Sequence, residues 1–441
     1  MGMPRLAAAI ALATVFWGAA GHAATGYVPN AWGPVSKGMA GAGIALDGVG
    51  PLSGANNPAA ILGVADQELQ LALFAIYAVP RFEVGAPAGG SCPVGSGPLC
   101  LNPGSSRGDP EAPLNTFFIP QGGMNWRLGD KAAFALIVYA NGGLNTTYDD
   151  FPNPGCPPPP ATEGEGVYCG GVTGIDLAQY FIAPTYAMQV TPRWRLGVSP
   201  ILALETVEFQ GLAAFANPRF SADPDHVKDS GHDYALGWGF KFGTQFQATD
   251  SLSVAAVIQT EIDVGSFKDY AGILPDHGQL DIPAYAEFGV AWRFLLRWTA
   301  AFDVQRVYYS NVPAFGNEPD APRRFGAGDG PGFGWDDGTI YKFGLSWQAS
   351  ATWTWRAGYA HVDPIPLNED DLFLGLMAQS VMQDQYALGA SWLYGQGGAI
   401  DFSFLYSARN ELEGRNRFVP SQRIQVSLED VELDLSWRHR F

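Results

Sequence analysis

Apolar and polar residues alternate along most of the chain after residue 67. The clearest example is the C-terminal segment, residues 431–441. One face of this segment is apolar apart from His439, and it contains Val431, Leu433, Leu435, Trp437 and Phe441. The opposite face is polar and contains Glu432, Asp434, Ser436, Arg438 and Arg440. A strand that crosses a membrane as part of a β-barrel has about 9–11 residues, with apolar side chains toward lipid and polar ones toward the lumen. The length and alternation of this segment predict such a strand.

The same alternation recurs in at least four more segments, whose apolar faces run through residues 234–242, 341–347, 353–359 and 400–406 at every second position. Trp and Tyr stand near the ends of these faces, where the aromatic girdles of membrane barrels lie. One segment of this kind also fits the edge strand of a soluble sheet, but a series of five favours a membrane barrel.

Counting every candidate gives about fourteen strands, and an even number is typical of bacterial outer-membrane barrels. The predicted fold class is therefore all-β: a transmembrane antiparallel β-barrel of about 14 strands formed by residues 67–441. The candidate strands lie near residues 67–84, 114–127, 131–144, 175–191, 193–209, 231–248, 251–266, 279–294, 296–309, 338–348, 352–362, 384–394, 398–409 and 425–441.

The predicted strands are joined alternately by short turns and long loops. The short turns lie near residues 191–193, 248–251, 349–351 and 395–398. The long loops cover residues 85–113, 145–174, 210–230, 310–337 and 363–383. Because outer-membrane barrels have short periplasmic turns and longer extracellular loops, we expect the long loops to lie outside the cell.

The N-terminal residues do not follow the strand pattern. Residues 1–23 contain a basic residue, Arg5, an apolar stretch from Leu6 to Ala20 and small residues before position 24, which together predict a secretory signal peptide. An uncleaved N-terminal anchor is the alternative. Residues 24–66 are rich in Gly and Ala, and such a segment packs closely but cannot form a core of its own. We therefore expect the barrel to surround it.

The composition supports a membrane barrel and excludes other classes. Only 15% of the residues are charged, against about 25% in ordinary soluble domains. The mean hydropathy is nevertheless +0.00, which is too low for a protein of many membrane helices. Lys and Arg number 25 against 43 Asp and Glu, which gives a net charge of −18. Nucleic acid is excluded as a partner because phosphate binding needs a basic surface.

The four cysteines form two close pairs, Cys92 with Cys100 and Cys156 with Cys169, each within a predicted long loop. Four cysteines allow three connectivities. Local pairing is favoured because each pair closes a short loop, and disulfides indicate an oxidising compartment. Since no His lies nearby and the spacing differs from that of a zinc site, no metal site is predicted.

Catalytic chemistry has little support in the sequence. The six His are scattered, and no His-Glu-x-x-His, Gly-x-Ser-x-Gly or phosphate-binding Gly-rich motif occurs. We therefore expect no enzyme activity and no cofactor. An outer-membrane protease or a weak metal site near His226 and His232 is the alternative.

Four features together resemble the FadL family of outer-membrane transporters, which includes the TodX-type channels for aromatic hydrocarbons. They are the segment Gly38-Met-Ala-Gly-Ala-Gly-Ile-Ala45, the motif Asn57-Pro58-Ala59, the segment Val138–Leu144 in the third strand, and the aromatic C-terminus. The resemblance covers essentially the whole mature chain. It implies a hatch inside the barrel, formed by residues 24–66, with Gly41, Gly43, Asn57, Pro58 and Ala59 as hatch residues.

The resemblance also implies passive outer-membrane transport of hydrophobic molecules. Extracellular loops would capture the molecule, an interior pocket would receive it, and an inward kink in the third strand would open the wall laterally. Here the kink would lie at Asn141, Gly142 and Gly143, where two glycines permit a bulge; an ordinary strand end is the alternative. Long-chain fatty acids are the favoured substrate, and aromatic or alkane hydrocarbons are the alternative. A general diffusion porin is less favoured, because porins begin their first strand almost at once.

Two sets of candidate binding residues follow from the predicted loops and lumen. Apolar residues clustered in two loops could form a capture surface, although packing of the loops on each other fits equally well. These residues are Phe209, Leu212, Phe215, Phe220, Phe267, Tyr270, Ile273 and Leu274. Basic residues that face the lumen could receive a carboxylate, although pairing with lumenal acids is the favoured alternative. The basic residues are Lys241, Lys342 and Arg356, and the acids are Glu261, Glu287, Asp303 and Asp401.

The expected location is the outer membrane of a Gram-negative bacterium. The expected partners are outer-membrane lipid, a hydrophobic small molecule and, through the C-terminal strand, the barrel-assembly machinery. A plugged barrel with its own lateral outlet works without a second copy, so we expect a monomer.

Overall fold

The computed structural model describes residues 27–92, 96–101, 106–107, 116–150, 152–153, 156, 164–227, 230–319, 323–370 and 372–441. The predicted signal peptide, residues 1–23, lies outside the described residues, as do residues 24–26 of the predicted hatch and residues 114–115 of the second predicted strand. Within the described part of the chain, no helix is long and apolar enough to cross a membrane.

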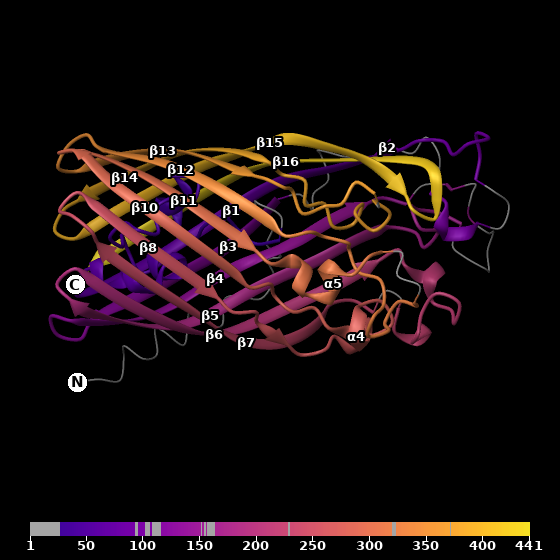
Figure 1. Ribbon diagram of the computed structural model, residues 1–441, viewed down its shortest axis with the longest axis horizontal. Coiled ribbons are helices and arrows are strands. Elements are labelled where there is room, and N and C mark those ends of the chain that lie inside the picture. Colours follow the sequence, from indigo (N-terminus) through magenta and orange to yellow (C-terminus); the bar gives the residue numbers. More distant parts are fainter. Residues whose placement is uncertain are drawn as a thin grey trace.

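Fourteen long strands form one antiparallel sheet, and the sheet closes because its last strand, β16, pairs with its first, β1 (Figure 1). The predicted closed barrel of 14 antiparallel strands is thereby confirmed. Its strands are β1 (Gln67–Val84), β3 (Thr116–Arg127), β4 (Ala132–Tyr148), β5 (Thr173–Thr191), β6 (Trp194–Gln210), β7 (Asp233–Gln247), β8 (Leu252–Gln259), β10 (Tyr285–Leu295), β11 (Trp298–Val307), β12 (Gly338–Gln348), β13 (Trp353–Val362), β14 (Asp384–Tyr394), β15 (Gly398–Asn416) and β16 (Val419–Arg440). Two short strands, β2 (Ser106–Arg107) and β9 (Asp263–Val264), pair with β1 and β7.

The alternation along each strand decides which side chains face outward and which face the lumen. On β16, Leu433 and Leu435 are 44% and 54% exposed on the outer surface, whereas Glu432 and Asp434 are each 1% exposed. The outer surface therefore forms an apolar band, as contact with lipid requires. The polar side chains lie in a filled lumen, where most of them have hydrogen-bond partners.

Several predicted strand boundaries differ from the structure. The predicted strand 251–266 ends at Gln259, and the predicted strand 279–294 begins at Tyr285. The predicted strands 398–409 and 425–441 extend to Asn416 and back to Val419, so they form one long hairpin. The exposed face of this extension carries charged residues, so the alternation in sequence gave no sign of it. These residues are Glu411, Glu413, Arg415 and Arg423.

The two ends of the barrel differ (Figure 1). Short turns and the C-terminus lie at one end, here called the turn end, and the long connections lie at the other, the loop end. Both disulfides, Cys92–Cys100 and Cys156–Cys169, lie in the long connections, so the predicted local pairing is confirmed. The connections also contain short helices: η2 (Gly97–Leu99), η4 (Ala213–Phe215), η5 (Pro224–His226), η6 (Lys268–Tyr270), α4 (Pro275–Gly278), η7 (Tyr309–Asn311) and α5 (Pro313–Gly316).

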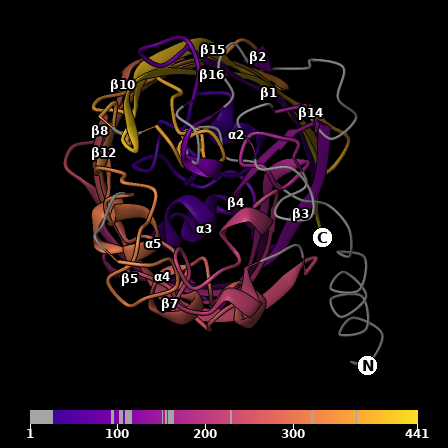
Figure 2. The same cartoon turned by 90° about the vertical axis from the view of Figure 1, so that its right-hand side faces the viewer.

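Residues 27–66, here called the lumenal segment, run inside the ring of strands (Figure 2). The segment contains the short helices α2 (Pro34–Lys37), α3 (Ser53–Asn56) and η1 (Pro58–Gly63). Most of its residues are buried. The Gly- and Ala-rich stretch is therefore surrounded by the barrel, as its composition led us to expect.

Glycines on the inner wall allow the backbone of the lumenal segment to come close. A Cβ built on Gly358 of β13 would lie 2.1 Å from the carbonyl carbon of Met39. A Cβ built on Gly389 of β14 would lie 2.8 Å from the Cα of Gly38. Both distances are shorter than real carbon contacts, so a larger residue at either position would displace the segment from the wall.

Candidate functional site

The wall of the barrel is incomplete between β3 and β4 toward the loop end. β3 pairs with β1 along residues 116–126, and β4 pairs with β5 along residues 132–148. β3 and β4 pair with each other only where residues 122–127 face residues 133–138. Within these described strands, the facing edges of residues 116–121 and 139–148 therefore have no ladder partner. We call this region the wall opening.

A β-bulge at Asn141 lies at the edge of the wall opening. Ala140 pairs with Tyr180 and Gly142 pairs with Gln179, so the ladder between β4 and β5 skips Asn141. The extra residue shifts the phase of the strand: odd-numbered residues are buried before it, and even-numbered residues are buried after it. The structure thus has a bulge at the position where the sequence predicted a kink.

The lumenal segment covers the wall opening from inside. The indole Nε1 of Trp32 donates a hydrogen bond to the carbonyl oxygen of Ala140 at 2.9 Å. A Cβ built on Gly142 would lie 2.2 Å from the carbonyl oxygen of Tyr27, so only glycine permits this approach. Because an unpaired backbone group facing lipid costs several kcal/mol, the segment stabilises a wall that the ladder leaves open.

Replacing Trp32 with Phe is expected to destabilise the closed wall. Phe keeps an aromatic ring but removes the donor to Ala140, and a buried carbonyl without a partner costs about 1–3 kcal/mol. Urea unfolding in detergent micelles would measure the loss against Trp355→Phe, which changes an indole on the exposed outer face. Equal stability of the two variants would show that the bond to Ala140 contributes nothing.

An apolar cluster runs through the wall at the opening. Its buried members lie on the lumenal face of β1 and β3, and its other members pack against them from β3, β4 and β5. The buried members are Phe74, Ile76 and Ile119, and the others are Phe117, Ala140 and Tyr180. By alternation, Ala140 and Tyr180 stand at outward positions. Apolar surface is therefore continuous from the lumen to the lipid-facing side.

Tyr27 connects the bulge to the neighbouring strands β5 and β6 through polar contacts. Asn141 Nδ2 donates to Gln179 Oε1 at 2.8 Å, and Gln179 Nε2 donates to the Tyr27 hydroxyl. The Tyr27 hydroxyl donates to Glu205 Oε1 at 3.1 Å. All four side chains are buried. The bulge, two neighbouring strands and the lumenal segment thus share one hydrogen-bond chain.

Tyr27 also contacts the connections at the loop end. Its ring packs on Phe315 of α5 with 4.5 Å between centroids. The next backbone N–H, of Val28, donates to the Tyr309 hydroxyl at 3.4 Å. Burial raises the pKa of the Tyr309 phenol, so the hydroxyl stays neutral. One residue of the lumenal segment therefore contacts both the bulge and the loops.

The residues predicted to form a capture surface gather at the loop end, but all except the partly buried Phe220 are buried there. Five of them line one apolar cavity of ≈ 30 Å³: Phe209, Leu212, Phe215, Ile273 and Leu274. The other three, Phe220, Phe267 and Tyr270, belong to the same apolar cluster or pack against it. The aromatic rings pack on one another, as in the alternative of loops that pack together, and their role in capture stays a prediction. We call residues 211–227, 265–281, 308–319 and 323–335 the loop cap.

The predicted long loop 363–383 does not project from the barrel. Its residues 372–382 are all buried, and they are mostly apolar. Thr146 Oγ1 donates to the carbonyl of Met377 at 2.7 Å, and the Tyr148 hydroxyl donates to the carbonyl of Leu376 at 3.0 Å. This inward loop therefore lies against β4 beyond the bulge, where it supplies contacts that β3 does not.

All three predicted lumenal cations contact the protein, and Lys342 and Arg356 bond to side chains of other strands. Lys342 Nζ lies 2.9 Å from Glu287 Oε1 and donates to the carbonyl of Asn30 at 2.6 Å. Arg356 donates to Ser391 Oγ at 2.7 Å. The contacts of Lys342 match the alternative in which lumenal charges pair across the wall and anchor the lumenal segment, whereas Arg356 bonds an uncharged hydroxyl.

The third cation, Lys241, has different surroundings. Its Nζ donates to the carbonyl of Ala55 at 2.7 Å and to the Tyr139 hydroxyl at 3.3 Å, and it lies 4.1 Å from the centre of the Trp32 ring. Its contacts are thus a carbonyl, a hydroxyl and an aromatic face instead of a carboxylate. Among the predicted lumenal acids, Glu261 is exposed because β8 ends two residues earlier, so its predicted lumenal position is wrong.

The Asn57-Pro58-Ala59 motif begins helix η1 and contacts the wall. Asn57 Oδ1 accepts the N–H of Ala59 at 3.0 Å, and Asn57 Nδ2 donates to the carbonyl of Ile44 at 2.8 Å. Pro58 lies against Gly197 of β6, where a Cβ would be 2.4 Å from the Pro58 carbonyl carbon. The motif therefore joins two parts of the lumenal segment and places them on the wall.

The glycines predicted for the hatch lie where the lumenal segment meets β11 and its own first residues. The N–H of Gly43 donates to Asp303 Oδ2 at 2.6 Å. A Cβ built on Gly41 would lie 2.5 Å from the carbonyl oxygen of Asn30, and the φ of Gly41 is +85°. Gly41 must lack a side chain because the carbonyl of Asn30 lies so close to it. Gly43 supplies the backbone N–H that binds Asp303.

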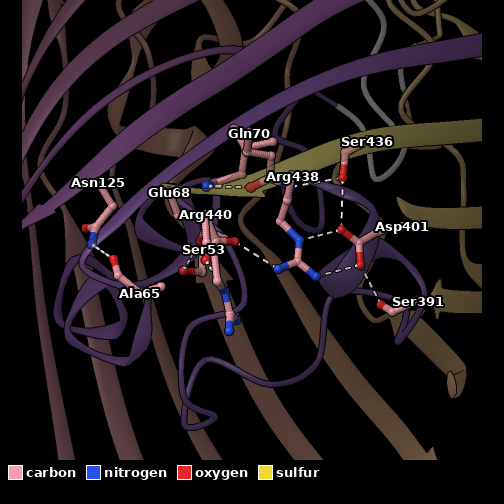
Figure 3. A network of polar contacts seen from close by, with 12 residues as sticks. Ser53, Ala65, Glu68, Gln70, Asn125, Ser391, Asp401, Ser436, Arg438 and Arg440 are labelled. Atoms are coloured by element: carbon pink, nitrogen blue, oxygen red, sulfur yellow. Dashed lines mark hydrogen bonds and ion pairs between the residues drawn. The ribbon is translucent and has the colours of Figure 1, made fainter. Parts of the chain in front are cut away.

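A polar network at the turn end joins the lumenal segment to the seam between β1 and β16 (Figure 3). Arg438 donates to Asp401 through Nε at 2.6 Å and Nη2 at 3.0 Å, and through Nη1 to Glu68 at 2.8 Å. Gln70, the neighbour of Glu68 on the lumenal face of β1, accepts the N–H of Leu52 at 3.1 Å. The network therefore connects barrel closure to the position of the lumenal segment.

A cavity of ≈ 230 Å³ lies between the lumenal segment and the wall near this network. Its lining includes Trp32, Asn56, Gln70 and Arg356. Trp32 also lines a cavity of ≈ 10 Å³ at the wall opening, together with Phe74 and Gly142. The Trp32 side chain thus stands between an interior cavity and the opening.

Sequence reasoning did not identify Tyr27 and Trp32, which make the principal contacts at the opening. They are the two aromatic residues of a segment otherwise rich in Gly and Ala, and that contrast was the available sign. Their partners lie more than a hundred residues away in the chain, so no local pattern pointed to the contacts.

Comparison with known proteins places these features in a family context. The family model described as outer membrane protein transport protein (OMPP1/FadL/TodX) matches residues 10–425. The P. putida toluene transporter TodX has a TM-score of 0.66 at 16% identity, with 93% of this chain and 99% of that chain covered. A Pseudomonas aeruginosa FadL homologue gives 0.66 at 17%, covering 94% and 99%. The Ralstonia pickettii toluene transporter TbuX gives 0.63 at 17%, covering 93% and 99%. A search of curated proteins finds no match.

Proposed function

The chain belongs to the outer membrane transport protein family OMPP1/FadL/TodX, and we propose that it carries hydrophobic molecules passively across the outer membrane. In this family context the protein is a channel-type transporter instead of an enzyme, and its loop end faces the outside of the cell. The route we propose runs from the loop cap to the lumen and then sideways through the wall opening.

The observation that carries this proposal is the wall opening itself. The ladder between β3 and β4 stops at Val138, and an apolar cluster continues from the lumenal face to the outward residues Ala140 and Tyr180. A hydrophobic molecule gains little from a water-filled channel, but it can partition into lipid through a gap in the wall. The bulge at Asn141 supports a gap in the ladder, because it reverses which side chains of β4 face inward just beyond the last pair with β3.

The lumenal segment is the element that we propose to move, and we assign residues 24–66 the role of a hatch. Tyr27 contacts Phe315 of the loop cap, Gly142 at the bulge and Gln179 of β5. A molecule that enters the apolar cavity of the cap would disturb the packing around Phe315 and, through it, Tyr27. Withdrawal of Tyr27 and Trp32 would then uncover the opening.

Two substrate classes fit the route up to this point. Long-chain fatty acids, favoured from the sequence, need a cation for the carboxylate, and Lys241 supports them because its partners are uncharged. Aromatic or alkane hydrocarbons need no cation. They are supported by the relatives of this fold whose titles name toluene transport.

Uptake by cells that lack their own transporter tests the proposal. We would measure the initial uptake of labelled toluene and labelled oleate with and without the protein, after confirming a folded, heat-modifiable barrel in the outer membrane. Small labelled sugars serve as the control for a general diffusion porin. Uptake of sugars without either hydrophobic compound would refute the proposed function.

A further inference from the structure

Three carboxyl groups form a stripe on the lumenal face of β16. Asp430, Glu432 and Asp434 occupy alternate positions of the strand, and each residue is 1% exposed. We call them the acidic stripe. A buried carboxylate lowers the stability of a protein unless it is paired. Three carboxyl groups at alternate positions of one strand are therefore better explained by a function than by stability.

The strand register places the acidic stripe beside the wall opening. Asp434 pairs with Phe74 of β1, and Glu432 pairs with Ile76, which are two of the three buried members of the apolar cluster. Gln121, on the unpaired part of β3, donates to Asp434 Oδ2 at 3.3 Å. A cavity of ≈ 30 Å³ beyond the bulge is lined by Asp430 and by residues 143–146 of β4. A molecule leaving through the opening therefore passes close to these carboxyl groups, and also to Lys37, which lines the cavity at the opening.

Carboxyl groups of the stripe outnumber the cations that form ion pairs with it among the described residues. Lys37 of α2 lies 2.5 Å from Glu432 Oε2, with its ammonium 3.2 Å from the centre of the Phe74 ring. Among the described residues, Glu432 Oε1 and Asp434 Oδ1 have no hydrogen-bond partner. Within the part of the chain that the structure describes, one ammonium thus pairs with the stripe, and the buried oxygens Glu432 Oε1 and Asp434 Oδ1 remain unpartnered next to the opening.

From this arrangement, and resting on the proposed function, we infer that the acidic stripe is a charge filter that lets neutral hydrophobic molecules leave through the wall and rejects anionic ones. A fatty acid carboxylate passing the opening would approach like charges in surroundings of low polarity, where repulsion is strong. A neutral hydrocarbon or alcohol meets no such barrier. Specificity of this kind comes from a repulsive element instead of an additional attraction.

The test compares two probes with the same tail, oleic acid and oleyl alcohol, which differ in charge at neutral pH. Cells without their own transporter would express the wild type or the double variant Asp430→Asn/Asp434→Asn, which keeps side-chain size. We expect the wild type to take up the alcohol at least about tenfold faster than the acid, and the double variant to raise acid uptake about tenfold while alcohol uptake stays unchanged. The two single variants replace the double variant if it does not assemble.

Glu429→Gln is the matched control. Glu429 is the neighbour of Asp430 on the same strand, but it is partly exposed and pairs with Arg81, so its neutralisation should leave the ratio of the two uptakes unchanged. Equal uptake of acid and alcohol by the wild type, or an unchanged ratio in folded stripe variants, would overturn the charge filter and leave the transport route intact. Uptake of neither probe, nor of toluene, by a folded wild-type barrel would overturn both.

Discussion

Deletion of Asn141 is expected to abolish uptake of hydrophobic molecules while the barrel remains folded. Asn141 is the residue that the ladder between β4 and β5 skips, so its removal leaves Ala140 and Gly142 adjacent and in register with Tyr180 and Gln179. The part of β4 beyond the bulge would then regain the phase of the part before it. Its freed edge could pair with residues 116–121 of β3, and each new pair closes more of the opening.

We expect the uptake of labelled toluene by this deletion variant to fall to the level of cells without the protein, a change of tenfold or more. Asn141→Ala is the matched control, because it keeps the bulged residue and loses only the hydrogen bond to Gln179; its uptake should stay within about twofold of the wild type, as the loss of one such bond changes stability by only about 1 kcal/mol. A deletion variant that is folded and still transports would show that the molecule leaves by another path.

The barrel could be predicted from the sequence because lipid and lumen impose opposite requirements on successive residues. Segments such as 431–441 show both requirements at once, and the fourteen strands follow from them. The prediction was least accurate for segments that do not separate lipid from the lumen. Many outward-facing residues of the hairpin 410–424 are themselves charged, and the inward loop 372–382 is mostly apolar because it is buried in the lumen. Neither segment therefore shows the alternation that is typical of a membrane strand.

The candidate site was predictable only in its backbone features. Gly142 and Gly143 indicated a position where the strand could bulge, and glycines at lumenal positions of the alternation, such as Gly358, are visible in the sequence. The residues that cover the opening were not predictable in this way. Trp32 contacts Ala140, and Tyr27 contacts Glu205, across long stretches of chain, and such contacts depend on how the lumenal segment lies in the barrel.

The lumenal face shows two uses of buried charge. At the wall opening the acidic stripe has more carboxyl groups than cations, and we attribute selectivity to that excess. At the turn end the charges balance more closely, since Arg438 lies between Asp401 and Glu68, and Arg440 also contacts Glu68 at 3.0 Å. The second arrangement is expected to support the closure of the barrel instead of the passage of substrate.

Replacing Arg438 with Met is therefore expected to give a large loss of stability. The change keeps most of the apolar stem but leaves the buried Asp401 without its bidentate partner, and removal of one member of a buried ion pair costs about 3–5 kcal/mol. The loss should appear as a lower midpoint of urea unfolding in lipid vesicles and as heat modification at a lower temperature. The seam between β1 and β16 would be weakened directly, because Arg438 on β16 bonds Glu68 on β1 (Figure 3).

Arg440→Met separates this effect from the general loss of an arginine at the seam. Arg440 contacts the same glutamate, but its side chain is 55% exposed, and exposed ion pairs contribute only about 0–1 kcal/mol. A further variant, Arg438→Met with Asp401→Leu, removes the orphaned carboxylate and should recover much of the loss, since an apolar pair of similar volume replaces a buried ion pair at little cost. If Arg438→Met and Arg440→Met were equally stable, the buried network would contribute no more than a surface pair. Barrel closure would then depend on the ladder between β1 and β16, which runs from Glu68 with Arg440 to Val84 with Ile424.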